Sequence, residues 1–457
     1  MDMQSVNPLN GQIIQTYKAL SEKEIVTKIT EADAAWLLWK QTTFQKRALL
    51  LLNAAIVLRN RKEELARLMA LEMGKPLSEG RSEIEKCAVV CEFYGAQGAR
   101  FLKEEPVHTE GRKRWVCFRP LGVILAVMPW NFPFWQVFRF LAPGLMAGNC
   151  GLLKHASNVP GCALAIENIL LQAGAPPGVF QTLLAGSGAV AGIISHPVIK
   201  GVAFTGSTAA GQRVAGVAGA SLKKAVLELG GSDPYIILAD ADLQQAAEVC
   251  VASRLVNNGQ SCIAAKRFIV SEEVEAPFTA LIREKMMAKQ TGDPLLEKTQ
   301  LGPMARKDLR DELHQQVLEN IRAGAKCILG GNIPALPGDH AFYEPTILTG
   351  IQKGMPAYRE EMFGPVASVI TVKNDREAIR VANDTSFGLG AAVFTKDAEL
   401  AEAMAKDQLE AGSCFINSMV RSDPQLPFGG IKQSGFGREL GAYGIREFVN
   451  IKTVVAE

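Results

Sequence analysis

The sequence lacks several features that would mark specialised classes of protein. Only five histidines occur among 457 residues, and none stands at a ligand spacing from a cysteine, so no metal site is expected. The nine cysteines are odd in number and form no Cys-x-x-Cys pair. Residues 1–12 lack the basic and apolar regions of a secretion signal. Reduced thiols and a cytoplasmic location are the resulting expectation.

No uninterrupted apolar run is long enough to suggest a membrane span. The most apolar stretch, 121–153, is broken by Pro129, Pro133, Arg139 and Pro143. It predicts a buried strand, a loop and a buried helix, so no membrane association is expected. The length of 457 residues with 21% charged residues is typical of a globular chain with more than one domain.

Acidic residues are almost absent from residues 111–227, where Glu167 is the only carboxylate against ten bases. This segment therefore carries +9, whereas the whole chain carries only +2. A concentration of positive charge favours an anionic ligand. The bases are scattered among apolar residues and form no dense cluster, so nucleic acid is not an expected partner.

The order of elements predicts an α/β fold. The first hundred residues have helical periodicity, and Ser21 with Glu24 forms a capping-box pattern. Between residues 123 and 228, apolar strands alternate with helices, which predicts a doubly wound parallel sheet. A second α/β series follows from Tyr235. Residues 108–127 predict a strand pair, and residues 448–455 predict a final strand.

Two glycine-containing loops each join a predicted strand to a predicted helix. Gly186–Gly192 resembles a dinucleotide fingerprint but is one residue longer, and no acid follows at the usual spacing of about 20 residues. The loop 204–211 offers free amides at a helix N-terminus, where Ser207 could bind an anion or simply cap the helix. For both loops, the alternative is a turn that has only a structural role.

Three polar residues stand where catalysis is chemically reasonable. Cys262 follows an Asn-Gly turn near Lys266 and Arg267, and an electropositive loop could lower its thiol pKa and make it a nucleophile. Glu228 ends an apolar strand, where it could be a general base or part of a structural ion pair. Asn131 stands between two prolines, where its amide could stabilise an oxyanion or belong to a packed turn.

Taken together and in this order, the motifs resemble the aldehyde dehydrogenase superfamily over essentially the whole chain. The resemblance is closest to the short bacterial and cyanobacterial succinate-semialdehyde dehydrogenases. The matching segments are 129–133, 154–157, 204–208 with Gly211, 228–231, 259–262, 361–365, and 427–430 with 434–438.

The resemblance implies two doubly wound α/β domains, one for the cofactor and one for catalysis, with a β oligomerisation arm. The cofactor domain would comprise residues 1–106 and 124–228, and the catalytic domain residues 229–430. The arm would comprise residues 107–123 and 431–457. The family also implies a homodimer or a homotetramer.

The resemblance further implies oxidation of an aldehyde to an acid through a thioester on Cys262. Asn131 and the backbone N–H of Cys262 would hold the oxyanion, and Glu228 would deprotonate the hydrolytic water. The cofactor would be held by Trp130, Lys154, Ser157, Gly188, Gly206, Ser207, Gly211, Glu361 and Phe363.

The resemblance also bears on the choice of cofactor and substrate. Ser157 replaces a glutamate that many NAD-specific relatives carry, and with Lys154 it favours NADP over NAD. For succinate semialdehyde, Arg139 is the expected cation for the distal carboxylate, with Arg421 and Ser422 completing the clamp. The alternative is that Arg139 pairs with an internal carboxylate.

Other functions remain open at this point. The substrate could be another semialdehyde, such as glutarate semialdehyde, or a general aliphatic aldehyde. Acyl transfer to coenzyme A is a further alternative, against which the hydrolytic base Glu228 argues. A catalytically silent structural or binding homologue is the alternative outside enzymes.

Overall fold

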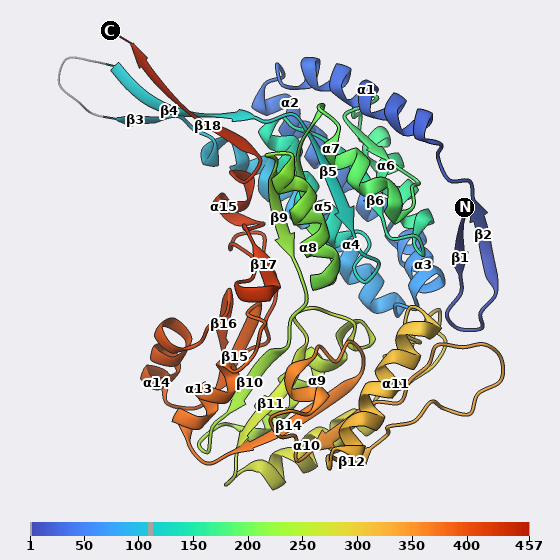
Figure 1. Ribbon diagram of the computed structural model, residues 1–457, viewed down its shortest axis with the longest axis vertical. Helices are drawn as coiled ribbons and strands as arrows, with labels where there is room; N and C mark the ends of the chain where they lie inside the picture. The colour runs from blue at the N-terminus through green and yellow to red at the C-terminus, as the bar shows by residue number, and fades with distance from the viewer. Residues whose placement is uncertain (1, 108–112, 457) are drawn as a thin grey trace.

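The computed structural model describes residues 2–107 and 113–456, which fold into two α/β lobes and a projecting β arm (Figure 1). The first lobe is built on six strands, which in sheet order are β17 (Gly435–Phe436), β9 (Lys224–Glu228), β8 (Ile199–Thr205), β5 (Val123–Met128), β6 (Cys150–His155) and β7 (Phe180–Thr182). Strands β9, β8, β5, β6 and β7 are parallel, and β17 joins β9 in the antiparallel sense. The principal helices of this lobe are α1 (Glu22–Trp39), α2 (Phe44–Asn60), α3 (Lys62–Met73), α4 (Leu77–Phe101), α5 (Trp135–Ala147), α6 (Pro160–Gln172), α7 (Val190–Ser195) and α8 (Thr208–Ala220).

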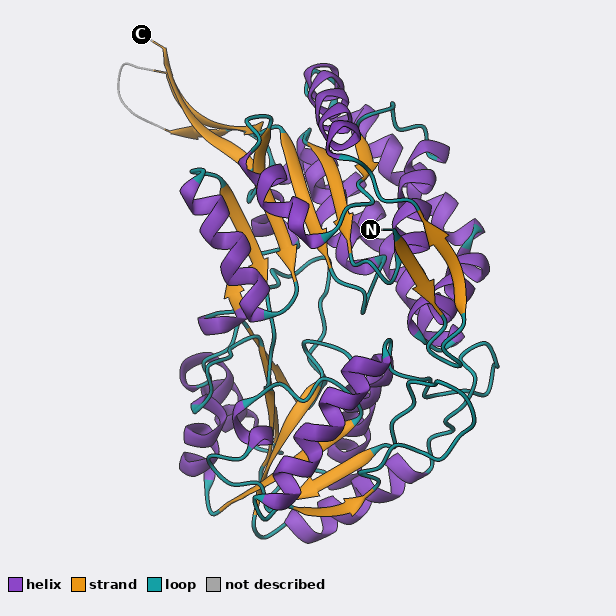
Figure 2. Cartoon of the chain, turned by 45° about the vertical axis from the view of Figure 1, so that its right-hand side comes forward, coloured by secondary structure: helices purple, strands orange, loops and turns teal. Residues whose placement is uncertain are grey.

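The second lobe contains a seven-stranded sheet, reached by the chain after Glu228. In sheet order its strands are β12 (Lys326–Leu329), β13 (Thr346–Thr349), β14 (Val366–Val372), β11 (Ala265–Ser271), β10 (Asp233–Ile237), β15 (Gly390–Phe394) and β16 (Ser413–Ile416). Only β12 is antiparallel to its neighbour. The helices are α9 (Leu243–Leu255), α10 (Glu275–Met287), α11 (Lys307–Arg322), α12 (Pro356–Arg359), α13 (Asp375–Asn383) and α14 (Ala398–Ala403). Figure 2 shows the helices of both lobes around their sheets, so the predicted pair of α/β sheets is confirmed.

The arm is an antiparallel sheet of β3 (Glu105–Val107), β4 (Lys113–Pro120) and β18 (Val449–Ala456), with β4 in the centre. The predicted pairing within residues 108–127 is wrong for the described part, because β5 pairs with β6 and β8 rather than with β4. Gly122, at φ +144°, turns the chain from the arm into the first sheet. Residues 108–112 of this predicted pair lie outside the described residues. The predicted C-terminal strand at 448–455 is β18.

The C-terminal segment contributes to more than the arm. Residues of β17 extend the first sheet, whereas the short helix α15 (Gly441–Ile445) and β18 follow further along the chain. The segment 431–457, which the sequence assigned wholly to the arm, is therefore divided between the arm and the first lobe.

The N-terminal region is helical, as predicted, from α1 onward. The capping box is present, because Ser21 Oγ accepts from the Glu24 N–H and the Glu24 carboxylate accepts from the Ser21 N–H. The sequence did not reveal the preceding hairpin of β1 (Met3–Val6) and β2 (Ile13–Tyr17). Strand β1 has only four residues and buries the polar Ser5, and β2 is largely exposed, so neither shows the alternation of apolar and polar residues by which a half-buried strand is recognised.

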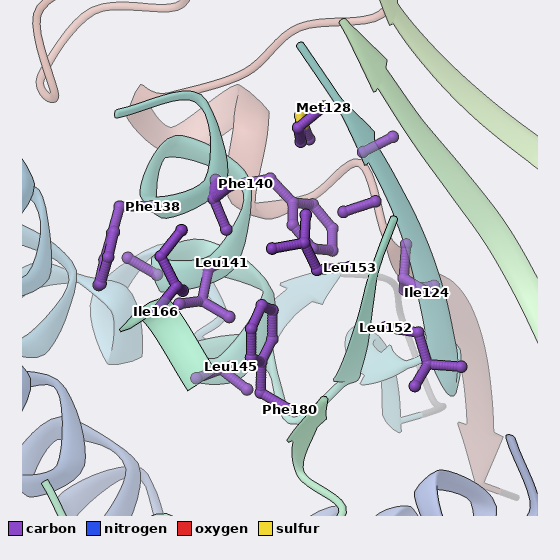
Figure 3. Packing of buried hydrophobic residues seen from close by; sticks show 14 of the residues in the cluster. Ile124, Met128, Phe138, Phe140, Leu141, Leu145, Leu152, Leu153, Ile166 and Phe180 are labelled. Atoms are coloured by element: carbon purple, nitrogen blue, oxygen red, sulfur yellow. The ribbon is translucent and has the colours of Figure 1, made fainter. Parts of the chain in front are cut away.

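The apolar stretch 121–153 forms β5, α5 and β6, as its interrupted pattern predicted. Every residue of α5 is buried. Figure 3 shows Phe140 and Leu145 of α5 packed with Leu153 of β6 and Phe180 of β7. Within residues 2–107 and 113–456, no helix is both long and apolar enough to cross a membrane. This core fixes the carboxyl ends of β5 and β8, from which loops run to the candidate site.

Candidate active site

A cavity of about 290 Å³ is lined by residues of both lobes. From the first lobe come the loops after β5 and β8, and from the second come the Cys262 loop, the segment before β14 and one face of α11. Its walls include seven residues that the sequence predicted, namely Trp130, Asn131, Gly206, Ser207, Cys262, Glu361 and Phe363. The rings of Trp130 and Phe363 meet edge to face, 5.9 Å apart between centroids.

The loop before Cys262 has an unusual backbone that is held by side-chain amides. Asn257, Asn258 and Gly259 all have positive φ, near +53°, +56° and +77°. Asn258 Nδ2 donates to the carbonyl oxygens of Gly74 (3.0 Å) and Pro303 (2.9 Å). A Cβ on Gly259 would overlap the backbone of Gly364. The Asn-Gly pattern is therefore required by the loop geometry that presents Cys262.

Asn131 is fixed by hydrogen bonds on both its side chain and its backbone. Its Nδ2 donates to the Gln260 carbonyl (3.1 Å), and its Oδ1 accepts from Gln136 Nε2 (3.0 Å). The Asn131 carbonyl accepts from Asn257 Nδ2 (2.7 Å) and Lys75 Nζ (3.0 Å). One N–H of the Asn131 amide is left free to face a ligand.

A buried ion pair supports the Asn131 loop from beneath. Lys75 pairs with Glu83 of α4, and both side chains are almost completely buried. The Glu83 carboxylate also accepts from the backbone N–H groups of Phe134 (2.8 Å) and Trp135 (3.0 Å) at the start of α5. The pair therefore anchors the loop and the first turn of α5 to the same point.

Cys262 itself is half-buried, and its thiol is protonated at neutral pH in this conformation. Burial raises its pKa to about 12, although the nearby charges of Lys266 and Arg139 oppose the increase. Lys266 Nζ donates to the Cys262 carbonyl (2.7 Å) and pairs with Glu361 at 3.2 Å. The expected lowering of the Cys262 pKa is therefore wrong for this conformation, because desolvation outweighs both cations.

Glu228 is buried at the end of β9, opposite Thr205, which lines the cavity. Neither carboxylate oxygen has a hydrogen-bond partner among the described residues. Burial raises the pKa of Glu228 to about 8, opposed by Arg139 and reinforced by Glu439. A carboxyl group that titrates near neutral pH suits a general base.

Arg139 is committed to contacts inside the protein. Its guanidinium pairs with Glu439, lies 3.9 Å from Glu228, and donates to Thr205 Oγ1 at 3.4 Å. It is 3% exposed, and the Phe428 ring covers it at 4.8 Å. This is the internal ion pair that the sequence left as the alternative, so the Arg139 guanidinium is occupied by protein groups and not by a substrate carboxylate.

The other two residues predicted to bind the substrate carboxylate, Arg421 and Ser422, differ in their exposure to solvent. Arg421 is exposed, whereas Ser422 is 6% exposed. Ser422 Oγ accepts from Lys86 Nζ (2.7 Å) and from Trp135 Nε1 (3.1 Å). The structure thus brings Ser422 together with a lysine that the sequence did not single out.

Three of the remaining predicted cofactor residues, Lys154, Ser157 and Gly188, line two further cavities that share Lys154. One, of about 730 Å³, includes Ser157 and Asn158, and the other, of about 680 Å³, includes Gly188 and Arg213. Both side-chain amide atoms of Asn158 lack partners within the described part of the chain. Burial lowers the pKa of Lys154.

These two cavities fit a dinucleotide that carries an additional phosphate. Lys154 and Arg213 are cations without ion pairs in the described residues, and Ser157 adds a hydroxyl. Ser207 is the N-cap of α8, and its Oγ accepts from the Ala210 N–H. Because Ser207 lines the cavity that holds Cys262, the free N-terminal amides of α8 lie at that cavity. Gly211 does not share this role, because a Cβ there would overlap Leu229. Its glycine allows close packing of α8.

Sequence reasoning missed several cavity residues. They are Gln136, Thr205, and the α11 side chains Leu309, Glu312, Leu313 and Gln316. Gln136 lies three residues after the motif 129–133 and Thr205 lies within the motif 204–208, so these motifs could have indicated both residues. The α11 face has no such signal, because only the docking of the lobes brings it to the cavity. Arg213, one of the ten bases of residues 111–227, also lines a cavity.

The chain is similar to known proteins both in sequence and in structure. The aldehyde dehydrogenase family matches residues 1–454. A protein named probable succinate-semialdehyde dehydrogenase (NADP+), from Synechocystis sp., is 49% identical over 454 residues, covering 99% of each chain. One from Escherichia coli K12, named succinate semialdehyde dehydrogenase (NAD(P)+), is 45% identical over 450 residues, covering 98% of this chain and 97% of its own. The crystal structure of succinic semialdehyde dehydrogenase from Streptococcus pyogenes with NADP+ matches with TM-score 0.96 and 36% identity, covering 99% of each chain.

Proposed function

Because the chain belongs to the aldehyde dehydrogenase family, we propose that it oxidises succinate semialdehyde to succinate, with NADP as the preferred cofactor. The observation that carries the proposal is the cavity in which Cys262 and Asn131 meet beside the aromatic pair of Trp130 and Phe363. Relatives that match this chain over nearly its full length are named for the same substrate.

The catalytic roles follow from the contacts. Cys262 is the nucleophile, and its thiol must first lose a proton because burial holds its pKa near 12. Glu228, whose pKa is raised to about 8, is the base for the hydrolytic step. When Cys262 attacks the carbonyl carbon, the free N–H of Asn131 and the Cys262 backbone N–H stabilise the oxyanion.

The second half of the reaction is hydrolysis. Nicotinamide, when bound, would supply the hydride acceptor. Loss of the hydride from the tetrahedral carbon on Cys262 would leave a thioester. Glu228 then removes a proton from water, and the resulting hydroxide releases the acid and the thiol. This hydrolytic base favours an acid product over transfer to coenzyme A.

The cofactor would extend from the cavity that holds Cys262 to the two cavities that share Lys154. Trp130, Gly206, Ser207, Glu361 and Phe363 would hold the nicotinamide and pyrophosphate portion. Lys154, Ser157, Gly188 and Arg213 would hold the adenosine portion. A hydroxyl at Ser157 accepts a 2′-phosphate without charge repulsion, and the cations pair with it. NADP is therefore preferred, with NAD as the alternative.

The experiment that tests this function compares succinate semialdehyde, glutarate semialdehyde and butanal with NADP and with NAD. We expect the highest kcat/KM for succinate semialdehyde with NADP, and no stimulation by coenzyme A. A higher value for another aldehyde would overturn the substrate assignment. Absence of activity with every aldehyde, together with no aldehyde protection of Cys262 from alkylation, would indicate a silent homologue.

The domain assignment and assembly are part of the same proposal. Residues 1–106 and 124–228 form the cofactor domain and 229–430 the catalytic domain, while 107–123 and, from the segment 431–457, strand β18 form an arm that joins copies of the chain. The arm exposes Ile451 (61%) and Val455 (49%), as expected of a surface that pairs in a homodimer or homotetramer. All nine cysteines are free, which supports a reducing cytoplasmic location.

A further inference from the structure

One buried lysine, Lys266 of β11, holds two consecutive backbone carbonyls at the proposed nucleophile. Its Nζ donates to the carbonyl oxygen of Ser261 at 2.8 Å and to that of Cys262 at 2.7 Å. Its third N–H is left for Glu361 Oε1, at 3.2 Å. The side chain is 1% exposed, so these three oxygens occupy all the donors of the ammonium.

The Ser261 carbonyl belongs to the same peptide unit as the Cys262 N–H, the proposed oxyanion donor. In a trans peptide the C=O and the N–H point in opposite directions, so the Cys262 N–H is directed away from Lys266. The Ala264 N–H also donates to the Ser261 oxygen, at 3.2 Å, whereas no described residue accepts from the Cys262 N–H. This peptide is therefore fixed at its oxygen, and its N–H is available to a ligand.

A positive charge at the Ser261 oxygen also strengthens the Cys262 N–H as a donor. Hydrogen bonds to charged groups are stronger than neutral ones, and linked hydrogen bonds polarise one another where the dielectric constant is low. Ser261 and Lys266 are both almost fully buried. Because the oxyanion develops only when Cys262 attacks, a stronger donor stabilises the transition state more than the neutral carbonyl compound.

The groups around Lys266 compensate its charge inside the protein. Burial and the like charge of Arg254 lower the pKa of Lys266, whereas Glu361, Asp233 and Cys262 oppose the decrease. Glu361 also forms the ion pair with it. The ammonium is therefore held by backbone oxygens and carboxylates from several segments, and not by solvent.

We propose that Lys266 is a positioning residue that orients and polarises the Ser261–Cys262 peptide, so that its N–H is a strong donor to the oxyanion. The inference rests on the proposed function, because it requires attack of Cys262 on a carbonyl carbon. Lys266 acts through this peptide and does not itself contact a ligand. The second oxyanion donor, the Asn131 amide, is held by Gln136 and Gln260 and not by Lys266.

The test compares two reactions of Cys262 that need neither cofactor nor aldehyde. With p-nitrophenyl acetate, the thiolate attacks the carbonyl carbon, an oxyanion forms, and departure of p-nitrophenolate leaves an acetyl thioester. With iodoacetamide, the thiolate displaces iodide and no oxyanion forms. Both rates depend on the fraction of thiolate, so the ratio of acetylation to alkylation isolates stabilisation of the oxyanion. Cys262→Ser gives the background rate of each reaction.

In Lys266→Met, alkylation at pH 8 should slow about tenfold, because loss of a nearby cation raises the pKa of the Cys262 thiol. The other charges near the thiol, those of Arg139, Glu228 and Glu361, remain in this variant. Acetylation should slow about 100-fold or more, because the oxyanion donor is weakened as well. The ratio of the two rates should thus fall about tenfold, which a general loss of structure would not predict.

Lys223→Met is the matched control. Lys223 Nζ also donates to two backbone carbonyls, those of Ile194 and His196, but it lies just before β9, at the opposite end of that strand from Glu228. Acetylation and alkylation of Cys262 should both keep their rates in this variant.

The double variant Lys266→Met with Glu361→Gln separates polarisation of the peptide from the charge of Glu361. It leaves no unpaired carboxylate, so it also avoids the folding defect that a single change in an ion pair can cause. The ratio of acetylation to alkylation should fall as in Lys266→Met. A normal ratio would assign the loss to the unpaired Glu361 and would overturn the inference.

The outcomes separate this inference from the proposed function. If mass spectrometry finds no acetyl group on Cys262 of the unmodified chain, Cys262 does not attack carbonyl carbons, and the proposed function fails together with the inference. If Cys262 is acetylated but Lys266→Met slows both reactions equally, Lys266 acts on the thiol alone and only the inference is overturned. Unchanged rates for both reactions would overturn it as well.

Discussion

The site has an aldehyde end, around Cys262 and Asn131, and a nucleotide end, around Lys154 and the loop Gly186–Gly192. The two ends are constructed in opposite ways. Around Cys262, Asn257 and Asn258 hold strained backbone through hydrogen bonds to distant carbonyls. In the loop Gly186–Gly192, by contrast, a Cβ on any of its three glycines would have no neighbour within 4 Å. The chain itself therefore determines the positions of the reacting groups, whereas the nucleotide end leaves room for a ligand to complete it.

The charges of the two ends differ in the same way. At the aldehyde end, buried cations have carboxylate partners, as in Lys75 with Glu83 and Lys266 with Glu361. At the nucleotide end, Lys154 and Arg213 have no ion pair within the described residues. Paired charges preserve a geometry, while unpaired charges are available to an anion. Glu228, the proposed base, is the exception at the aldehyde end, because it approaches Arg139 only to 3.9 Å and accepts no hydrogen bond from the described residues.

The largest expected effect comes from removing the carboxylate of Glu228. Glu228→Gln should reduce steady-state kcat about 10²- to 10⁴-fold, because the general base for thioester hydrolysis is lost. A rapid burst of NADPH should remain, because Glu228 is the base for hydrolysis and not for formation of the thioester, and the acyl enzyme should be detectable by mass spectrometry. Glu284→Gln, at an exposed position of α10, is the matched control and should retain full activity. Normal turnover in Glu228→Gln would remove Glu228 from the mechanism.

A second effect tests how rigid the aldehyde end is. Gly259→Ala places a Cβ at positive φ and against the Gly364 backbone, which should lower the free energy of unfolding by about 1–3 kcal/mol. Displacement of Cys262 should reduce kcat about 100-fold. Chemical denaturation and steady-state kinetics measure the two losses. Activity close to that of the unmodified enzyme would show that the Cys262 loop tolerates movement.

The pH dependence should report the raised pKa of Glu228. Burial and Glu439 raise this pKa to about 8 against Arg139, so the carboxyl is mostly protonated, and inactive as a base, at pH 6. Where hydrolysis limits kcat, kcat should rise roughly tenfold per pH unit below about 8 and then become constant. A kcat measured from pH 6 to 9 that is constant throughout would contradict the assignment.

The two ends also differ in how far the sequence could describe them. Cys262, Asn131 and Glu228 adjoin the ends of strands in local motifs, so their neighbourhood could be predicted from short stretches of chain. The partner of Arg139 could not, because Glu439 lies 300 residues later and reaches it only through the folded C-terminal segment. The pKa of Cys262 was predicted in the wrong direction, since burial is not visible in local charge. Parallel sheets were predictable from strand–helix alternation, whereas the pairing of β4 with β18 depends on distant chain.

A smaller effect should follow from adding charge at the nucleotide end. Ser157→Glu should shift the ratio of kcat/KM for NADP and NAD about 10- to 100-fold toward NAD, because a carboxylate repels the 2′-phosphate. Aldehyde kinetics with saturating NAD should change little. Ser82→Glu, at an exposed position of α4, introduces the same charge away from these cavities and should leave the ratio unchanged. An unchanged ratio in Ser157→Glu would place the 2′-hydroxyl away from this loop.

The smallest effect is expected for Gly188→Ala, the counterpart of Gly259→Ala. Gly188 does not have positive φ, and an added methyl meets no protein atom within 4 Å. The free energy of unfolding should therefore change by less than about 0.5 kcal/mol. Because the cavity it borders is about 680 Å³, the KM for NADP should rise less than about threefold. A rise of tenfold or more, with stability unchanged, would mean that adenosine packs directly on Gly188. The nucleotide end would then be as closely fitted as the aldehyde end, but to its ligand rather than to the protein.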